Sequence, residues 1–259
     1  AVSGLMSTIG YPDRPPVRIG ASVIDMGTGI LSAFLVVSAL VDRSDGAGGE
    51  YFDVSLFETA VSWMGYWIAR YTDSGAVPDQ SGQGFADIVP YEIFRAGDDE
   101  PFYLAVINDR LWKRFCDVLD LDDLATDPRF ETNDDRYEHQ AELRERLREE
   151  FGRYDRDTLV EVLAEANVPV GPLQHVDELV EADEQIIARD LLTDSYNVRT
   201  DTPVKTTGVP FKTADGRPRL DGRPPAVGED SAAVLSEVGY SDAEIDRLIR
   251  DGVVVSADD

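Results

Sequence analysis

A short glycine-rich segment, Ser81-Gly82-Gln83-Gly84, has the composition of a ligand-binding loop. Glycine-rich loops bring backbone amides close to a phosphate when they lie between a strand and a helix. This segment is too short for such a cradle, and it lies in a polar stretch that breaks the periodicity of its neighbours. Its spacing alone therefore favours a flexible loop that binds no ligand.

The titratable side chains do not have the spacing of a metal site or a nucleophile motif. Asp25 precedes an apolar helix and is expected to cap it, and Glu58 is expected on a solvated helix surface. His139 and His175 lie far apart in a chain without a Cys-x-x-Cys pair, so we expect no zinc site. Cys116 is the only cysteine, which excludes an intrachain disulfide and indicates a structural thiol in a reducing interior.

The N-terminal part alternates between helical and extended patterns. Residues 17–20 and 51–54 are expected strands, and residues 25–41 and 55–70 are expected helices. Small residues such as Gly27 allow the first helix to pack closely against a neighbour. The order helix, turn, strand, helix indicates an α/β arrangement.

A hairpin and several helices are expected in the middle of the chain. Residues 91–94 and 102–107 flank a turn rich in Gly and Asp, which predicts a β-hairpin. Helices are expected over residues 111–119, 136–151 and 156–166. We expect Asn108 or Asp109 to cap the first of these helices and Asp155 to cap the last, because these side chains cap helices well. Together these elements indicate a small α+β domain.

Shorter elements are expected in the last third of the chain. Residues 168–172 form an extended segment fixed by proline, and residues 209–212 have a strand-like pattern. Helices are expected over residues 177–181, 183–189, 231–237 and 242–250. Gly239 and Ser241 separate the last two, as a C-terminal glycine and an N-cap.

Acidic residues are in large excess, since 24 Lys and Arg against 51 Asp and Glu give a formal net charge of −27. The carboxylates are spread along the chain, and only three cations are lysines, at Lys113, Lys205 and Lys212. This pattern favours halophilic adaptation, of the haloarchaeal type, over an acidic face for a basic partner, which would cluster the charges. The same charge argues against nucleic-acid and anionic-membrane partners.

An apolar stretch at residues 29–41 is bracketed by Asp25 and Asp42. It is shorter than the roughly 20 residues that cross a bilayer. We therefore expect a buried helix there and no membrane span. The first residues do not resemble a signal peptide, so we expect a cytoplasmic protein.

Several motifs, in order along nearly the whole chain, resemble one enzyme family. Pro15-Pro16-Val17-Arg18-Ile19-Gly20 runs into Asp25 and a helix with small residues. Further matching motifs are Gly48-Gly49-Glu50-Tyr51-Phe52-Asp53-Val54-Ser55-Leu56, Val89-Pro90-Tyr91-Glu92-Ile93-Phe94, Asp127-Pro128-Arg129-Phe130 and Val168-Pro169-Val170-Gly171-Pro172. Together they resemble the class III coenzyme A transferases, the CaiB/BaiF family.

This resemblance implies an α/β fold of the CaiB/BaiF type, an interlocked homodimer in which each chain has a large nucleotide-fold domain and a small α+β domain. Most of the N-terminal nucleotide-fold part is expected to be absent from this chain. The implied division is residues 1–72 for the rest of the large CoA-binding domain, 73–89 for a linker with the glycine loop, 90–190 for the small domain, and 191–259 for a return linker and a C-terminal segment that packs on the large domain.

The resemblance also implies an activity, the transfer of coenzyme A between carboxylic acids through an aspartyl-CoA thioester. The partners would be an acyl-CoA and a small organic acid, with the CoA thioester as substrate and no tightly bound cofactor or metal. The family's nucleophilic aspartate lies just before a segment whose end matches Ala1-Val2-Ser3-Gly4. The nucleophile is therefore expected upstream of Ala1, and this chain alone is expected to be inactive.

The site residues that the resemblance carries over form two sets. The substrate-loop set is Ser81, Gly82, Gln83 and Gly84, which match a mobile glycine loop that covers the aspartyl intermediate. The CoA-pocket set is Ile30, Asp25 and Arg18. For Ile30 the alternative interpretation is core packing, and for Asp25 and Arg18 it is a structural role.

Two other functions remain open. A 2-methylacyl-CoA racemase would share the fold, but the carboxylate that racemases place after the hairpin strand falls on Arg95, and a guanidinium cannot act as a general base. Transfer is therefore favoured over racemisation. A non-catalytic binding or assembly subunit is the third possibility, because the nucleophile is expected outside the chain.

Overall fold

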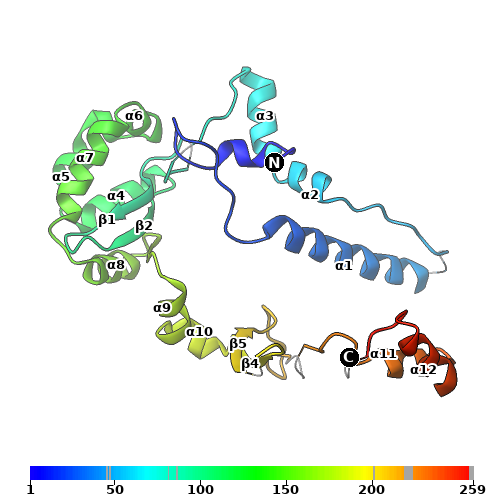
Figure 1. Cartoon of the computed structure of the whole chain (residues 1–259). Coiled ribbons are helices and arrows are strands. Elements are labelled where there is room, and N and C mark those ends of the chain that lie inside the picture. The colour runs from blue at the N-terminus through cyan, green and yellow to red at the C-terminus, as the bar shows by residue number, and fades with distance from the viewer. Residues whose placement is uncertain are drawn as a thin grey trace. The chain divides into compact units, whose positions relative to one another are not determined.

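The computed structural model divides the chain into two compact units, Ala1–Leu173 and Gln174–Asp259 (Figure 1). It describes residues 1–44, 46, 48–80, 82–85, 87–200, 202–218 and 224–256. The described elements combine α-helices with two small antiparallel sheets. The fold is therefore of the mixed α/β class that the sequence predicts.

The N-terminal part of the first unit is helical. It contains the 3₁₀-helix η1 (Leu5–Thr8) and the helices α1 (Val23–Ser44), α2 (Leu56–Ser62) and α3 (Gly65–Ser74). The single helix expected over 55–70 is thus two helices, because the amide of Met64 turns back to the carbonyl of Val61 at 2.9 Å. The side chain of Trp63 fills the space over Gly27 of α1, where a Cβ atom would lie 2.4 Å from its ring.

The two strands predicted in this part are wrong. Residues 17–20 and 51–54 have no strand assignment in the structure. A strand needs a neighbour to take up its backbone hydrogen bonds, and no described strand lies beside either segment. The local residue types favour extended backbone, but the pairing partner is missing.

The expectation that the apolar helix is buried is also wrong. Ile30 is 72% exposed, and Met26 and Phe34 of α1 are similarly open. With 22 residues and a mean hydropathy of 1.9 over an 18-residue window, α1 is also long and apolar enough to cross a membrane, a test that the core helix of a soluble protein passes equally. Because α1 is apolar around much of its circumference, one small neighbour cannot cover it.

A three-stranded antiparallel sheet follows, in the order β1 (Tyr91–Arg95), β2 (Pro101–Ala105) and β3 (Val170–Pro172). Ile93 pairs with Tyr103, and Leu104 pairs with Val170. The predicted hairpin is confirmed, and its turn closes with Asp99 in the left-handed region at φ 65°.

Between β2 and β3 the chain forms the helices α4 (Asp109–Val118), α5 (Asp122–Thr126), η2 (Pro128–Phe130), α6 (Asn133–Glu138), α7 (Gln140–Phe151) and α8 (Arg156–Glu165). Of these, α7 contacts β1, and α8 contacts β2 and β3. The predicted caps are confirmed: Asn108 accepts from the amide of Leu111 at 3.0 Å, and Asp155 accepts from the amide of Thr158 at 2.9 Å. The helix expected over 136–151 is interrupted at His139, which ends α6.

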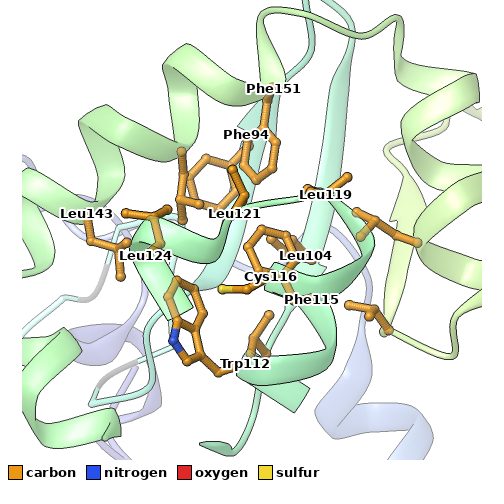
Figure 2. Close-up of a cluster of buried hydrophobic side chains, with 14 of the residues drawn as sticks. Phe94, Leu104, Trp112, Phe115, Cys116, Leu119, Leu121, Leu124, Leu143 and Phe151 are labelled. Atoms are coloured by element: carbon orange, nitrogen blue, oxygen red, sulfur yellow. The ribbon is translucent and has the colours of Figure 1, made fainter. Parts of the chain in front are cut away.

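The core of this sheet region (residues 89–173) is apolar and aromatic. Figure 2 shows Trp112, Phe115 and Cys116 of α4 among side chains of the sheet and of α7. Cys116 is buried and free, which confirms the structural thiol. Burial, with the nearby Asp117 carboxylate, raises the pKa of the Cys116 thiol to about 12, so it stays protonated and unreactive.

The second unit contains α9 (Val176–Glu181), α10 (Glu184–Arg189), the hairpin β4 (Leu192–Asn197) and β5 (Thr202–Thr207), α11 (Ser231–Glu237) and α12 (Asp242–Arg250). The four helices predicted here are confirmed. The strand predicted over 209–212 is wrong, because the carbonyls of Val209 and Phe211 accept from the guanidinium of Arg217 rather than from a strand. The hairpin β4–β5 was not predicted, since its threonines and charges show no apolar alternation.

Candidate functional site

A cavity of about 470 Å³ lies among the first elements of the chain. Its walls are η1, the segment leading into α1, the first turn of α1 and the start of α2. This volume is within the range of small-molecule sites, about 300–1,000 Å³. The lining is mainly apolar and includes Leu5, Met6, Ile9, Val23, Leu56 and Phe57.

Local sequence signals shape these walls. Gly4 begins η1 at φ 87°, a left-handed conformation that glycine adopts without strain. Ser55 caps α2 by accepting from the amide of Glu58 at 3.1 Å. The cavity is thus built from short, locally capped elements around the start of α1.

Arg18 and Asp25 are the charged side chains at this cavity. Both are exposed, and neither forms an ion pair with another residue in the described ranges. Asp25 lies in the first turn of α1 rather than at its N-cap as predicted, because the helix begins two residues earlier, at Val23. Ile30, the third expected pocket residue, lies on the exposed surface of α1 and does not line the cavity.

The glycine loop lies after α3, and its described residues are Gly82, Gln83, Gly84 and Phe85, while Ser81 falls outside the described residues. The amide of Gly82 donates to the carbonyl of Gly10 at 2.9 Å, and the amide of Phe85 donates to the carbonyl of Tyr91, also at 2.9 Å. Gly82 has φ 66°, whereas Gly84 has no positive φ. The two glycines therefore differ, and only Gly82 needs the left-handed region.

A second cavity, of about 430 Å³, lies beside this loop. Its two arginines are already engaged: Arg70 pairs with Asp87, and Arg144 donates to Glu92 at 2.7 Å. Arg144 also donates to the side chain of Gln140 at 2.6 Å. These pairs neutralise the guanidinium charges, so the cavity offers little attraction to an anion.

Aromatic side chains connect the loop to the sheet. Phe85 contacts Tyr91, with ring centroids 5.3 Å apart, and Tyr91 contacts Tyr103 at 5.6 Å. Partial burial and the neighbouring Tyr91 raise the pKa of Tyr103 to about 12. Its phenol is therefore a neutral hydrogen-bonding group at physiological pH and a poor general base.

The first cavity has the chemistry to hold a ligand with an apolar middle and an anionic end. Its walls suit alkyl and thioether groups, and the guanidinium of Arg18 can donate to a phosphate or a carboxylate. Within the described residues, no three His, Cys, Asp or Glu side chains are grouped to hold a metal ion. Arg18 and Asp25 of the pocket set line the first cavity, whereas Gly84 of the loop set lines the second.

Sequence reasoning missed two residues around these cavities, Phe57 and Gln80. Phe57 lines the first cavity, and Gln80 is buried beside the second. Neither residue type marks a binding site in the sequence, because an apolar residue on a helix or a glutamine occurs at many positions that have no ligand. Phe57 and Gln80 reach their cavities through contacts with residues that are distant in the sequence.

Comparison with known proteins places this arrangement in a family. The sequence model of CoA-transferase family III matches residues 1–231. An acetyl-CoA:oxalate CoA-transferase of Acetobacter aceti is 33% identical over 237 residues, covering 90% of this chain and 60% of the relative. A succinyl-CoA:mesaconate CoA-transferase of Haloarcula hispanica is 28% identical, covering 92% of this chain and 59% of the relative.

A solved structure supports the same conclusion. A CAIB/BAIF family protein from Brucella suis superposes with a TM-score of 0.71 at 31% identity, over 92% of this chain and 61% of the other. The chain spans about 60% of the length of the curated relative from Acetobacter aceti. The resemblance seen in the motifs is thereby confirmed at the level of family and fold, and this chain belongs to CoA-transferase family III.

Proposed function

We propose that this chain is part of an enzyme that transfers coenzyme A between carboxylic acids. The observation that carries the proposal is the family match over residues 1–231. The apolar cavity with Arg18 at its edge adds a place of suitable chemistry. The relatives' names mention oxalate, succinate and mesaconate, so a small dicarboxylic acid is the proposed acceptor class.

The proposed reaction uses an aspartate nucleophile that lies upstream of Ala1. Its carboxylate attacks the acyl-CoA carbonyl, the C–S bond breaks, and a mixed anhydride and the CoA thiolate form. The thiolate then attacks the aspartyl carbonyl, which gives an aspartyl-CoA thioester and releases the first acid. The acceptor acid repeats the two steps in reverse and leaves as its CoA thioester. With the nucleophile upstream, residues 1–259 alone are expected to be inactive.

In this proposal the first cavity binds part of the CoA thioester. Its apolar walls suit the pantetheine and acyl chain, and Arg18 donates to an anionic group of the substrate. The glycine loop covers the aspartyl intermediate, because glycines absorb large backbone changes without a Cβ penalty. No tightly bound cofactor takes part.

The exposed apolar helix α1 supports the proposal of an interlocked homodimer. A helix with apolar residues on most of its surface is usually covered, either by protein or by a membrane, and this proposal assigns the cover to protein. Further protein, from a second copy or from a longer polypeptide, would supply that cover. We place the enzyme in the cytoplasm, where Cys116 stays reduced.

Racemisation is a weaker candidate. Arg95 occupies the position where a racemase would need a carboxylate, and its guanidinium forms an ion pair with Asp99 of the adjacent turn at 3.4 Å. A permanently charged guanidinium cannot remove an α proton. A non-catalytic assembly subunit predicts no effect of Arg18 on turnover, which the following comparison tests.

The test compares Arg18→Gln with Arg14→Gln in an extended polypeptide that carries the family's upstream segment before Ala1. Arg14 is exposed in the same segment but does not line the cavity, so it is a matched control. Loss of one charge-assisted contact should raise the KM for succinyl-CoA about tenfold in Arg18→Gln. The control should stay within about twofold of the parent. Equal effects of the two variants would contradict a substrate role for Arg18.

A further inference from the structure

Two loops of the first unit meet at a buried glutamine. The first loop, residues 9–17, is closed at its base by the amide of Val17, which donates to the carbonyl of Ile9 at 3.1 Å. Inside it, the amide of Arg14 donates to the carbonyl of Tyr11 at 3.1 Å, and Asp13 has φ 66°. Prolines at positions 12, 15 and 16 fix φ there, so this loop is stiff.

Gln80 ties this stiff loop to the start of the glycine loop. Its side chain is only 8% exposed. With its amide nitrogen assigned toward the two backbone oxygens that face it, Gln80 donates to the carbonyl of Arg14 at 3.1 Å and to the carbonyl of Tyr11. Gly10 lies directly against the amide, since a Cβ at that position would be 3.3 Å from it.

The contact continues into the glycine loop. The amide of Gly82 donates to the carbonyl of Gly10 at 2.9 Å, and the ring of Tyr11 packs 3.5 Å from the position of a Cβ on Gly82. At the other end, Phe85 is held by Tyr91. Among the described residues of the loop, Gln83 and Gly84 make no hydrogen bond. The free span is therefore short and begins after Gly82.

The base of the first loop leads directly to the first cavity. Ile9 lines that cavity, and Arg18 follows the closing residue Val17. Because prolines restrict the backbone of residues 9–17, a displacement of Tyr11 or Arg14 also displaces this wall of the first cavity. Gln80 is therefore placed to couple the glycine loop to the cavity, although it lines only the second cavity.

We propose that Gln80 is a positioning residue: its buried amide holds the start of the glycine loop to residues 9–17, so that these two segments move together and only residues 83–84 flex. The part of this inference that concerns turnover rests on the proposed function. The positioning itself does not, because it concerns contacts within residues 1–259.

The positioning is tested on the chain itself by hydrogen exchange read by mass spectrometry. Gln80→Leu removes the two donated bonds at nearly constant volume, and Gln83→Leu is the matched control at an exposed glutamine of the same loop. Gln80→Leu should speed exchange about tenfold in peptides covering residues 9–17 and residues 82–85 together. Gln83→Leu should leave both peptides unchanged, and peptides of the sheet region should be unchanged in both variants.

A second variant covers the case in which Gln80→Leu does not fold. Gln80→Met has nearly the same length but no hydrogen-bond donor, so it should release both loops in the same way. Unchanged exchange in both loops of a folded Gln80 variant would overturn the positioning role. A change confined to one loop would overturn it equally, because the two segments would not be coupled.

The kinetic arm uses the extended polypeptide that includes the family's upstream segment. Gln80→Leu should lower kcat about tenfold while the KM for the CoA thioester stays within about twofold, because the loop acts after binding. Gln185→Leu, at an exposed glutamine of α10, is the kinetic control and should keep the parental values. If exchange changes but kcat does not, the coupling stands and the loop's proposed role in turnover is wrong.

Discussion

The sheet region (residues 89–173) and the N-terminal helices (residues 1–74) bury their apolar side chains to very different degrees. In the sheet region Phe102, Leu104 and Phe151 are fully buried, whereas Met26 and Ile30 of α1 are largely exposed. The first region finds its packing partners within the chain. The second leaves a largely apolar helix surface that the described residues do not cover.

This difference in burial explains which elements of the fold could be predicted from the sequence and which could not. Hairpin, caps and helices of the sheet region depend on nearby residues, such as Asn108 capping α4 within one turn. A strand at residues 51–54, or burial of α1, requires partners that no local pattern specifies. The family was readable because its motifs recur in order, but the contact of Gln80 with Tyr11 was not, since nothing in the sequence links two loops so far apart.

The largest effect is expected at Arg136, the fully buried cation of the sheet region. Its guanidinium donates to the carbonyl of Val89 at 2.8 Å and that of Phe130 at 3.1 Å, and it pairs with Asp109 at 2.9 Å. Arg136→Ala should lower the free energy of unfolding by about 3 kcal/mol or more, because buried carbonyls lose their donors. Urea unfolding checks this value.

The control for that change is Arg146→Ala. Arg146 forms an exposed ion pair with Asp123, so its loss should cost about 1 kcal/mol or less. If the two arginine variants had equal free energies of unfolding, the buried cation would not stabilise the sheet region, and this prediction would be wrong.

A smaller effect is expected at Gly97, in the turn between β1 and β2. A Cβ there would lie 2.5 Å from the carbonyl oxygen of Gly152, which is backbone and cannot move aside cheaply. Gly97→Ala should destabilise the sheet region by about 1–3 kcal/mol. Gly171→Ala in β3 is the control, because nothing lies within 4 Å of its Cβ position. Thermal unfolding that showed equal midpoints for the two variants would contradict this close contact.

Salt is expected to stabilise the chain moderately. The net charge of −27 makes dispersed carboxylates repel one another, and screening reduces that repulsion. The melting midpoint should rise by about 3 °C or more between about 0.1 M and 2 M KCl. A midpoint that stayed constant or fell would count against halophilic adaptation.

The smallest effect on stability is expected on the exposed surface of α1. Replacing Ile30 and Phe34 together by glutamine should change the free energy of unfolding of the dissociated chain by about 0.5 kcal/mol or less, because neither side chain is packed within the chain. Sedimentation velocity should at the same time show weaker self-association. Leu147→Gln in the buried core of α7 is the control and should unfold the sheet region. Strong destabilisation of the dissociated chain by the α1 pair would contradict this prediction, because it would show that the helix packs within its own chain.

The most direct test of the proposed function is a CoA-transfer assay on the extended polypeptide that carries the family's upstream segment. Succinyl-CoA is mixed with oxalate, mesaconate or glutarate, and the new CoA thioester is detected by mass spectrometry. We predict transfer to at least one of these acids, its loss when the upstream aspartate is replaced by asparagine, and no turnover by residues 1–259 alone. Exchange of an α proton of 2-methylacyl-CoA without transfer, or transfer that survives the asparagine variant, would contradict the proposal.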